Sequence, residues 1–290
     1  MNHTNKHVTL KLMLAILAGA IVAGASGCAS SSQPDISQFS NVRAQLDSSN
    51  ETITFPLDQY FMTFDEEREV EHANQILIDG CMRKYGLSDP VADADWQETS
   101  VPPNRKYGIW SLSSAEKYGY GEPEDPVAER TDKILQAQSQ AWANIWTKCG
   151  DRTKLLPVMI ENILSGPGVK QTKVGTTVGL EASDAASNNP KWAAARADWW
   201  KCLRSHGLVP RTGQGEWGPV LPTAETAQIR VAVQDVECKL KTNLVQKLAD
   251  LESQYQAAYA QPQQAALVQQ GKLKDKAVAE AKKIIATRNG

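Results

Sequence analysis

CMRKYGL, residues 81–87, recurs as CLRSHGL at residues 202–208, and this recurrence is the main clue to how the chain folds. The two stretches share a Cys, an Arg, a Gly and a Leu at the same spacing. A second pair of segments follows in the same order, CGDRTKLL from residue 149 and CKLKTNLV from residue 238. Because two independent motifs recur in one order, we interpret residues 55–164 and 188–260 as two copies of one unit.

The segment before the first CMRKYGL motif has the signals of a helix. Thr63 and Glu66 have the spacing of a capping box, in which each side chain satisfies a free amide at a helix start. Apolar residues at intervals of three or four then lead to Cys81. Gly86 follows where a helix commonly ends in a left-handed residue. The pattern predicts a helix that carries Cys81 near its C-terminal end.

The second copy has matching signals. Asn189 can cap a helix and Pro190 suits a first helical turn, after which an apolar stripe leads to Cys202. From Ile229 to residue 259 the apolar residues are again spaced by three or four, which predicts one long helix containing Cys238. Each unit is therefore expected to be helix, loop, helix, with one Cys on each helix.

The predicted fold class is all-α: two copies of a disulfide-closed helix-loop-helix unit plus a C-terminal helix, with little strand. Strand-like runs are confined to residues 51–56 and 174–180. The predicted organisation is a lipoprotein signal peptide (1–27), a tether and lead-in segment (28–54), the first unit (55–164), a linker of small and polar residues (165–187), the second unit (188–260) and a C-terminal helix (261–290).

The N-terminal residues have the order of a signal peptide. Lys6 and Lys11 precede an apolar run of 14 residues, Leu12–Ala25, and small residues then lead to Cys28. Small residues ending in Cys resemble the bacterial lipobox, whose Cys is lipidated and becomes the mature N-terminus. The run is shorter than the roughly 20 residues that span a bilayer. We predict lipidation at Cys28, with ordinary cleavage after Ala25 and an uncleaved anchor helix as the alternatives.

Four cysteines remain beside the lipidation candidate: Cys81, Cys149, Cys202 and Cys238. None has a second ligand at metal-binding spacing and none lies in a C-x-x-C motif, so no metal and no redox site is predicted. Outside the cytoplasm such an even set is typical of disulfides, with three connectivities. Duplication of a closed unit favours pairing the first two and the last two, while pairings between the copies stay open.

With these motifs stated, the chain resembles a group of uncharacterised actinobacterial lipoproteins. The resemblance rests on the lipobox, the PLDQY segment at 56–60, the paired C-M-x-x-x-G-L and D-V-x-C motifs and an aromatic-glycine loop. It covers most of the mature chain. It implies a lipid-anchored protein on the outer face of the bacterial cell membrane, and it brings no activity with it.

Two loops hold the candidate ligand contacts. A loop over residues 88–126 carries Tyr107, Trp110 and Tyr120, and a shorter one carries Trp217. Aromatic faces flanked by turns could stack on sugars, because long loops on a rigid scaffold are where binding usually resides. The favoured alternative is that these rings pack over the helices as lids.

Several enzyme motifs are missing from the sequence: it has no G-x-S-x-G elbow, no H-E-x-x-H and no Walker phosphate-binding loop. No catalytic residue and no cofactor is predicted. Glu252-Ser253 matches a dipeptide of helical enzymes that cleave peptidoglycan, but the Gly-rich segment that should follow is absent, so we interpret Glu252 as a solvated helix position. His206 aligns with Tyr85, which favours packing or capping over general-base chemistry.

The sequence therefore predicts a membrane-tethered extracytoplasmic lipoprotein that is a non-enzymatic binding or cell-envelope interaction module. A cell-wall-acting hydrolase and a transporter-associated solute-binding lipoprotein are the alternatives; the second needs alternating strands and helices. The predicted partners are the membrane, through the lipid anchor, and a cell-wall polymer or another envelope protein. A formal net charge of -2 gives no sign of nucleic-acid binding. Lysines near the end of the C-terminal helix could touch anionic polymers, although a solvated surface helix is favoured.

Overall fold

The structure is a computed structural model that describes residues 33–94, 96, 101–123, 125–158 and 173–289. The elements described below all belong to one compact part of the chain, Pro34–Gly290. The predicted signal peptide and Cys28 lie outside the described residues, as does part of the predicted linker.

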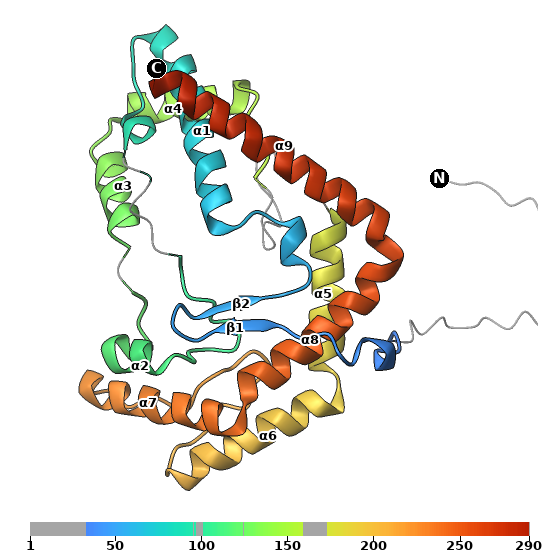
Figure 1. Cartoon of the computed structure of the whole chain (residues 1–290). Helices are drawn as coiled ribbons and strands as arrows, with labels where there is room; N and C mark the ends of the chain where they lie inside the picture. Colours follow the sequence, from blue (N-terminus) through green and yellow to red (C-terminus); the bar gives the residue numbers. More distant parts are fainter. Residues whose placement is uncertain (1–32, 95, 97–100, 124, 159–172, 290) are drawn as a thin grey trace, which may run out of the picture. The chain divides into compact units, whose positions relative to one another are not determined.

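The described residues are mostly helical, which confirms the predicted fold class (Figure 1). The longer helices are α1 (Phe64–Met82), α2 (Leu112–Tyr118), α3 (Pro126–Gln136), α4 (Gln140–Arg152), α5 (Lys173–Ser187), α6 (Pro190–Ser205), α7 (Glu225–Thr242), α8 (Leu244–Ala260) and α9 (Gln264–Asn289). Short 3-10 helices cover Ser37–Phe39, Asp58–Tyr60, Arg83–Tyr85, Pro90–Asp93 and Gln261–Gln263. Strands β1 (Gln45–Asp47) and β2 (Thr52–Thr54) pair antiparallel, with Leu46 opposite Ile53.

The predicted helix starts are confirmed by their capping contacts. The Thr63 hydroxyl accepts a hydrogen bond from the Glu66 amide at 3.3 Å, and the Glu66 carboxylate accepts one from the Thr63 amide at 2.9 Å. Asn189 accepts a bond from the amide of Lys191 at 2.9 Å, with Pro190 in the first turn. Both helices begin where free amides would otherwise lack a partner.

Each unit is closed by the disulfide that duplication favoured. Cys81 of α1 bonds Cys149 of α4, with the Cα atoms 5.7 Å apart. Cys202 of α6 bonds Cys238 of α7, with the Cα atoms 5.6 Å apart. The pairing between copies is therefore excluded, and each disulfide joins the two helices of its own unit.

Two expectations, one about a loop and one about the length of a helix, were wrong. The stretch 88–126 is not one long loop, because Ser111 caps α2 within it and Asp125, followed by Pro126, caps α3 at its end. The long helix predicted from Ile229 to residue 259 is broken at Asn243, whose φ of +52° ends α7 and starts α8. Asparagine adopts this left-handed conformation more readily than most residues, so an unbroken apolar spacing gave no warning of the break.

Part of the predicted linker is helical. Helix α5 occupies its last 15 residues and packs along α8 through Val178, Ala182, Ala185 and Ala186, all buried (Figure 1). The small and polar composition indicated a flexible segment, and 174–180 looked strand-like. Small side chains also allow close helix packing: a Cβ on Gly175 would lie 2.7 Å from the Phe61 ring. Tertiary packing therefore decided the outcome.

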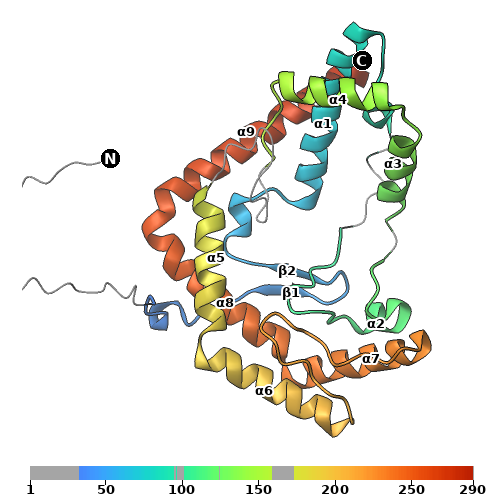
Figure 2. The ribbon, with the colours of Figure 1, turned by 180° about the vertical axis from the view of Figure 1, so that it is seen from behind.

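The predicted C-terminal helix, α9, runs back along α1, and both ribbon views agree on this placement (Figures 1 and 2). Val70 and Ala73 of α1 meet Ala277, Val278 and Ala281 of α9 in a buried apolar contact. None of the described helices has the length and apolar character needed to cross a bilayer.

Candidate functional site

The ends of α1 and α6 have the same local structure. Gly86 and Gly207 have φ angles of +73° and +74°. In each case the amide of the following Leu donates to a carbonyl five residues back, from Leu87 to Met82 at 3.2 Å and from Leu208 to Leu203 at 3.0 Å. The shared C-x-x-x-x-G-L pattern therefore encodes one kind of helix ending.

Gly80 marks the difference between the two units. It precedes Cys81, whereas a Lys precedes Cys202 at the matching position. A Cβ built on Gly80 would meet nothing within 4 Å. Two cavities use this open space, one between α1 and α9 with a volume of about 410 Å³ and one between α1 and α4 with a volume of about 430 Å³. Gly80 thus lines both cavities of the first unit.

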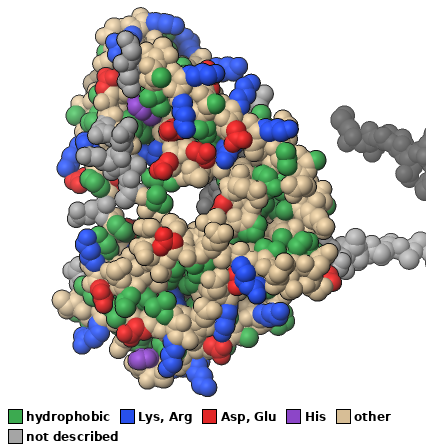
Figure 3. Space-filling model, in the orientation of Figure 1, with side chains coloured by type: hydrophobic (Ala, Val, Ile, Leu, Met, Phe, Trp, Pro, Cys, Tyr) green, Lys and Arg blue, Asp and Glu red, His purple; other side chains and the backbone are tan. Residues whose placement is uncertain are grey.

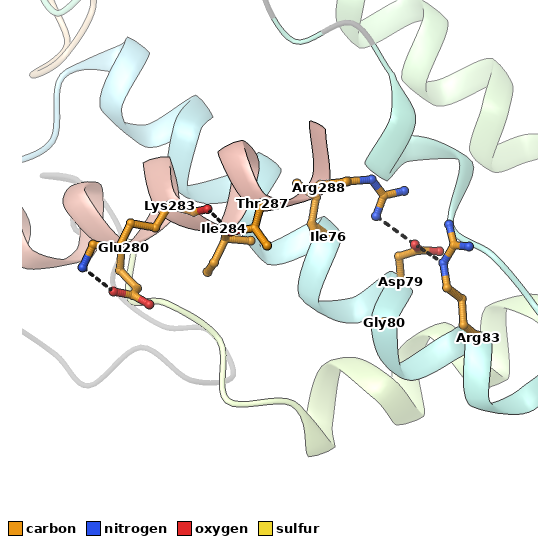
Figure 4. Close-up of a pocket in the computed structure, with 9 residues that line it drawn as sticks. All are labelled: Ile76, Asp79, Gly80, Arg83, Glu280, Lys283, Ile284, Thr287 and Arg288. Atoms are coloured by element: carbon orange, nitrogen blue, oxygen red, sulfur yellow. Dashed lines mark hydrogen bonds and ion pairs between the residues drawn. The ribbon is translucent and has the colours of Figure 1, made fainter. Parts of the chain in front are cut away.

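The α1–α9 cavity combines apolar side chains with charged groups (Figure 4). Asp79 accepts hydrogen bonds from Arg83 Nε at 2.7 Å, Arg288 Nη1 at 2.9 Å and the Asp89 amide at 2.8 Å. Burial tends to raise the pKa of Asp79, but these three bonds outweigh it and hold the pKa below its usual range. The remaining lining residues are Ile76, Gly80, Glu280, Lys283, Ile284 and Thr287.

The charges of this first cavity are satisfied within the protein. Arg288 also binds Asp93 at 2.5 Å, and Lys283 lies 3.4 Å from Glu280. Arg288 comes from the last turn of α9 and Asp79 from the last turn of α1, so their ion pair fastens the two helix ends together. We interpret these charges as structural, because a ligand would have to displace bonds that already exist.

The α1–α4 cavity has a different electrostatic character. Its charged lining residues, Lys84 and Arg152, are both cations and both exposed. Lys148 lies beside them, with its Nζ 4.7 Å from the centre of the Tyr85 ring. Among the described residues, none of these three cations has a carboxylate within ion-pair distance. Leu77, Gly80, Cys81 and Thr153 complete the lining.

Tyr85 links the cations of the α1–α4 cavity. Its side chain is 43% exposed, so its hydroxyl is accessible to solvent. A hydrogen bond and the positive charge of Lys148, with a smaller contribution from Arg152, lower the pKa of Tyr85. The first unit therefore presents a phenol and three cations around one cavity.

The four aromatic residues predicted as ligand contacts all make contacts within the protein, two of them buried and two half-buried. Tyr107 and Trp110 are buried, and Tyr107 donates a hydrogen bond to Glu252 at 2.8 Å. Tyr120 donates to a buried carboxylate, that of Asp235, at 3.1 Å. Trp217 is half-buried and meets Tyr107 edge-on at 5.5 Å between ring centres. These contacts are those expected of lids over the helices.

Glu252 is not a solvated position, contrary to the sequence-based interpretation. It is fully buried on α8 and accepts hydrogen bonds from Lys106 Nζ at 2.5 Å and from the Tyr107 hydroxyl. The apolar spacing of the helix indicates which residues share a face with Glu252. It carries no information on the loop with Lys106 and Tyr107 that covers this residue. With both carboxylate oxygens in use, Glu252 anchors that loop to α8.

A second buried ion pair was missed from the sequence. Lys239 lies 3.1 Å from Asp235 on α7 and donates to the carbonyls of Ile109 at 2.8 Å and Trp217 at 2.9 Å. Trp199 Nε1 donates to Asp235 at 2.8 Å. The i,i+4 spacing of the two charges was visible, but exposed helix pairs have the same spacing. This network holds both loops against the second unit.

Three side chains at the second disulfide are of the kinds that can coordinate a metal ion. A sulfur of Cys202, a sulfur of Cys238 and a ring nitrogen of His206 lie within 4.8 Å of one another. Both sulfurs are joined in the disulfide, which leaves His206 as a single ligand. His206 is exposed and forms the C-cap of α6, and Tyr85 occupies the matching place after α1.

Three of the five lysines of α9 have an acidic partner, Lys283 among them with Glu280. Figure 3 shows Lys and Arg side chains interspersed with Asp and Glu on the visible face. Lys274 lies 3.6 Å from Glu66, and Lys282 lies 3.5 Å from Glu69. Both pairs join α9 to α1, so these cations contribute to the packing of the C-terminal helix.

Comparison with family models, with curated proteins and with solved structures finds no match to this chain.

Proposed function

We propose that the protein is a lipid-anchored extracytoplasmic binding module without enzymatic activity, tethered through Cys28 to the outer face of the cell membrane. The two disulfides carry this proposal. Cys81–Cys149 and Cys202–Cys238 use every cysteine that follows Cys28. Disulfides persist in oxidising compartments, so the folded unit belongs outside the cytoplasm.

The binding surface in this proposal is the hollowed part of the first unit beside Gly80. The α1–α4 disulfide holds two helix ends at a fixed separation, which provides a rigid frame for recognition. Carboxylates at the neighbouring α1–α9 cavity are already paired, Asp79 with two arginines and Glu280 with Lys283. Neither is free to act as a general base, which favours binding over hydrolysis.

Duplication of one disulfide-closed unit fits the same proposal. The matched endings at Gly86 and Gly207 and the matched disulfides support a common origin. We propose that the two copies then diverged. The first copy has its cavities beside Gly80, and the second copy has Lys201 at the matching position.

The tether is tested by Cys28→Ala, with Ser32→Ala as the matched control in the same segment. We expect wild type and Ser32→Ala to enter the detergent phase and to carry diacylglycerol by mass spectrometry. Cys28→Ala should carry none. A wild-type protein without lipid would overturn the tether.

The absence of enzymatic activity is tested separately, by incubating the purified protein with cell-wall fragments and glycans. Bound fragments and released products are measured in the same samples. Release of products at a rate that depends on the amount of protein would overturn the non-enzymatic proposal.

A further inference from the structure

We infer that the α1–α4 cavity binds a phosphate ester group, held by Lys84, Lys148 and Arg152 with Tyr85 as a hydrogen-bond donor. This inference deepens the proposed binding function and rests on it. The shared ligand chemistry is a phosphate carried either by a soluble ester or by a lipid headgroup.

The charged side chains at the α1–α4 cavity are all positive. Lys84 and Arg152 line the cavity, Lys148 lies next to it, and the lining includes no Asp or Glu. The last turns of α1 and α4 bring about half a negative charge each, so three cations leave an excess of about two positive charges. A doubly charged oxyanion would balance this excess.

The second unit of the chain differs from the first at the matching positions. Counted from its cysteines, the second unit has Ser205 where the first has Lys84, and Glu237 where the first has Lys148. It also has Lys201 in place of Gly80. The position of Arg152 is matched by another cation, Lys241. The second unit forms the same disulfide and the same helix ending with these residues, so the fold does not require Lys84, Lys148 or the open space of the first.

The α1–α4 cavity also has the size and the frame of a small-molecule site. The cavity volume of about 430 Å³ lies within the range of about 300–1,000 Å³ that small-molecule sites occupy. Lys84 follows α1 and Arg152 ends α4, so the cations reach the cavity from two helices joined by the Cys81–Cys149 bond. A guanidinium binds two oxygens of one phosphate at once, and the ammonium and phenol groups can reach its other oxygens.

The test uses the chain from residue 28 onward, produced without lipid, which contains the whole unit Pro34–Gly290. Isotope-labelled protein is titrated with glycerol 3-phosphate, with glycerol as the neutral control, and amide shifts are followed by NMR. The variant Lys84→Gln with Arg152→Gln removes two cations of the cavity. The matched control, Lys201→Gln with Lys241→Gln, removes two exposed cations of the second unit.

We expect glycerol 3-phosphate to shift the amides of residues 84, 85 and 152, and glycerol to leave them unchanged. Because charge-assisted hydrogen bonds are the strong ones, the cavity variant should bind at least about tenfold more weakly, while the control variant binds as the wild type does. Both variants should keep the wild-type melting temperature. Equal binding by the cavity variant and the wild type would overturn the inference.

A second arm separates the two sources of phosphate. The same proteins are sedimented with vesicles of phosphatidylglycerol and of phosphatidylcholine. Binding to both the soluble ester and the phosphatidylglycerol vesicles, lost in the cavity variant, supports the site for either source. Vesicle binding alone, also lost in the cavity variant, assigns the headgroup. Failure to bind in both arms overturns the inference and leaves the Cys28 tether untouched, because the protein tested here carries no lipid.

Discussion

Gly80→Ala is predicted to stabilise the protein. Gly80 lies within α1, three residues before the following 3-10 helix, and its φ is not in the left-handed region. A Cβ at this position meets nothing within 4 Å, so the substitution adds no clash and buries no new surface. The remaining effect is the helix preference of Ala over Gly, about 1 kcal/mol in a helix interior.

The expected gain is therefore about 0.5–1 kcal/mol in the free energy of unfolding. For a chain of this size it corresponds to a rise of about 1–4 °C in melting temperature, measured by circular dichroism or calorimetry. Gly150→Ala is the matched control, because Gly150 lies in α4 beside Cys149 and its Cβ also meets nothing within 4 Å. Gly86→Ala should lower the melting temperature, since its φ of +73° disfavours any side chain.

Larger substitutions at the same two glycines test whether the open space serves the ligand. Gly80→Leu should fill space that both cavities share and weaken glycerol 3-phosphate binding, whereas Gly150→Leu should not. A lower melting temperature for Gly80→Ala would refute the reasoning, because it would mean that other atoms occupy the space beside α1. Equal binding by Gly80→Leu and the wild type would show that the open space does not serve the ligand.

Four further results are expected. Replacing Cys81 and Cys149 together by Ala releases a loop of 68 residues, which should cost about 4 kcal/mol in a denaturant titration; a loss below about 1 kcal/mol would contradict the role of the disulfide in closing the unit. Trp217→Ala should lower stability by about 3 kcal/mol because its ring packs among other aromatic rings, whereas unchanged stability would favour the ligand-contact interpretation. Lys239→Ala leaves a buried carboxylate unpaired and should cost about 3–5 kcal/mol, and a neutral result would show that the pair is dispensable. Burial lowers the pKa of His72, because the folded protein disfavours the charged imidazole. The stability that the neutral ring contributes is therefore present above the unfolded pKa of about 6.5 and is lost as the pH falls below that value. An NMR titration that gives a pKa at or above about 6.5 for His72 in the folded protein would contradict this sign.

Local signals in the sequence were sufficient to predict the starts of α1 and α6 and, together with the repeated motifs, the two disulfides. Thr63 with Glu66, and Asn189 with Pro190, satisfy free amides through contacts a few residues apart, so their spacing alone reveals them. The disulfide pairing could be chosen because the cysteine motifs recur. These features depend on neighbours in sequence or on repetition, both of which a single chain displays.

Features that depend on distant contacts could not be predicted. Glu252 is buried because Lys106 and Tyr107, about 145 residues away in sequence, cover it. Helix α5 forms from a segment of linker-like composition because α8 packs against its small residues. The cavities beside Gly80 need the positions of three helices at once. An isolated glycine before Cys81 was the only trace of them in the sequence.

The most direct test of the account is the intact mass of the protein purified from membranes, measured before and after reduction and alkylation. We expect a chain that begins at Cys28 with diacylglycerol attached, and four cysteines that are alkylated only after reduction. Peptide mapping without reduction should recover Cys81 linked to Cys149 and Cys202 linked to Cys238. An unmodified N-terminus or free thiols in the protein from the membrane would contradict the proposal of a lipid-anchored extracytoplasmic module.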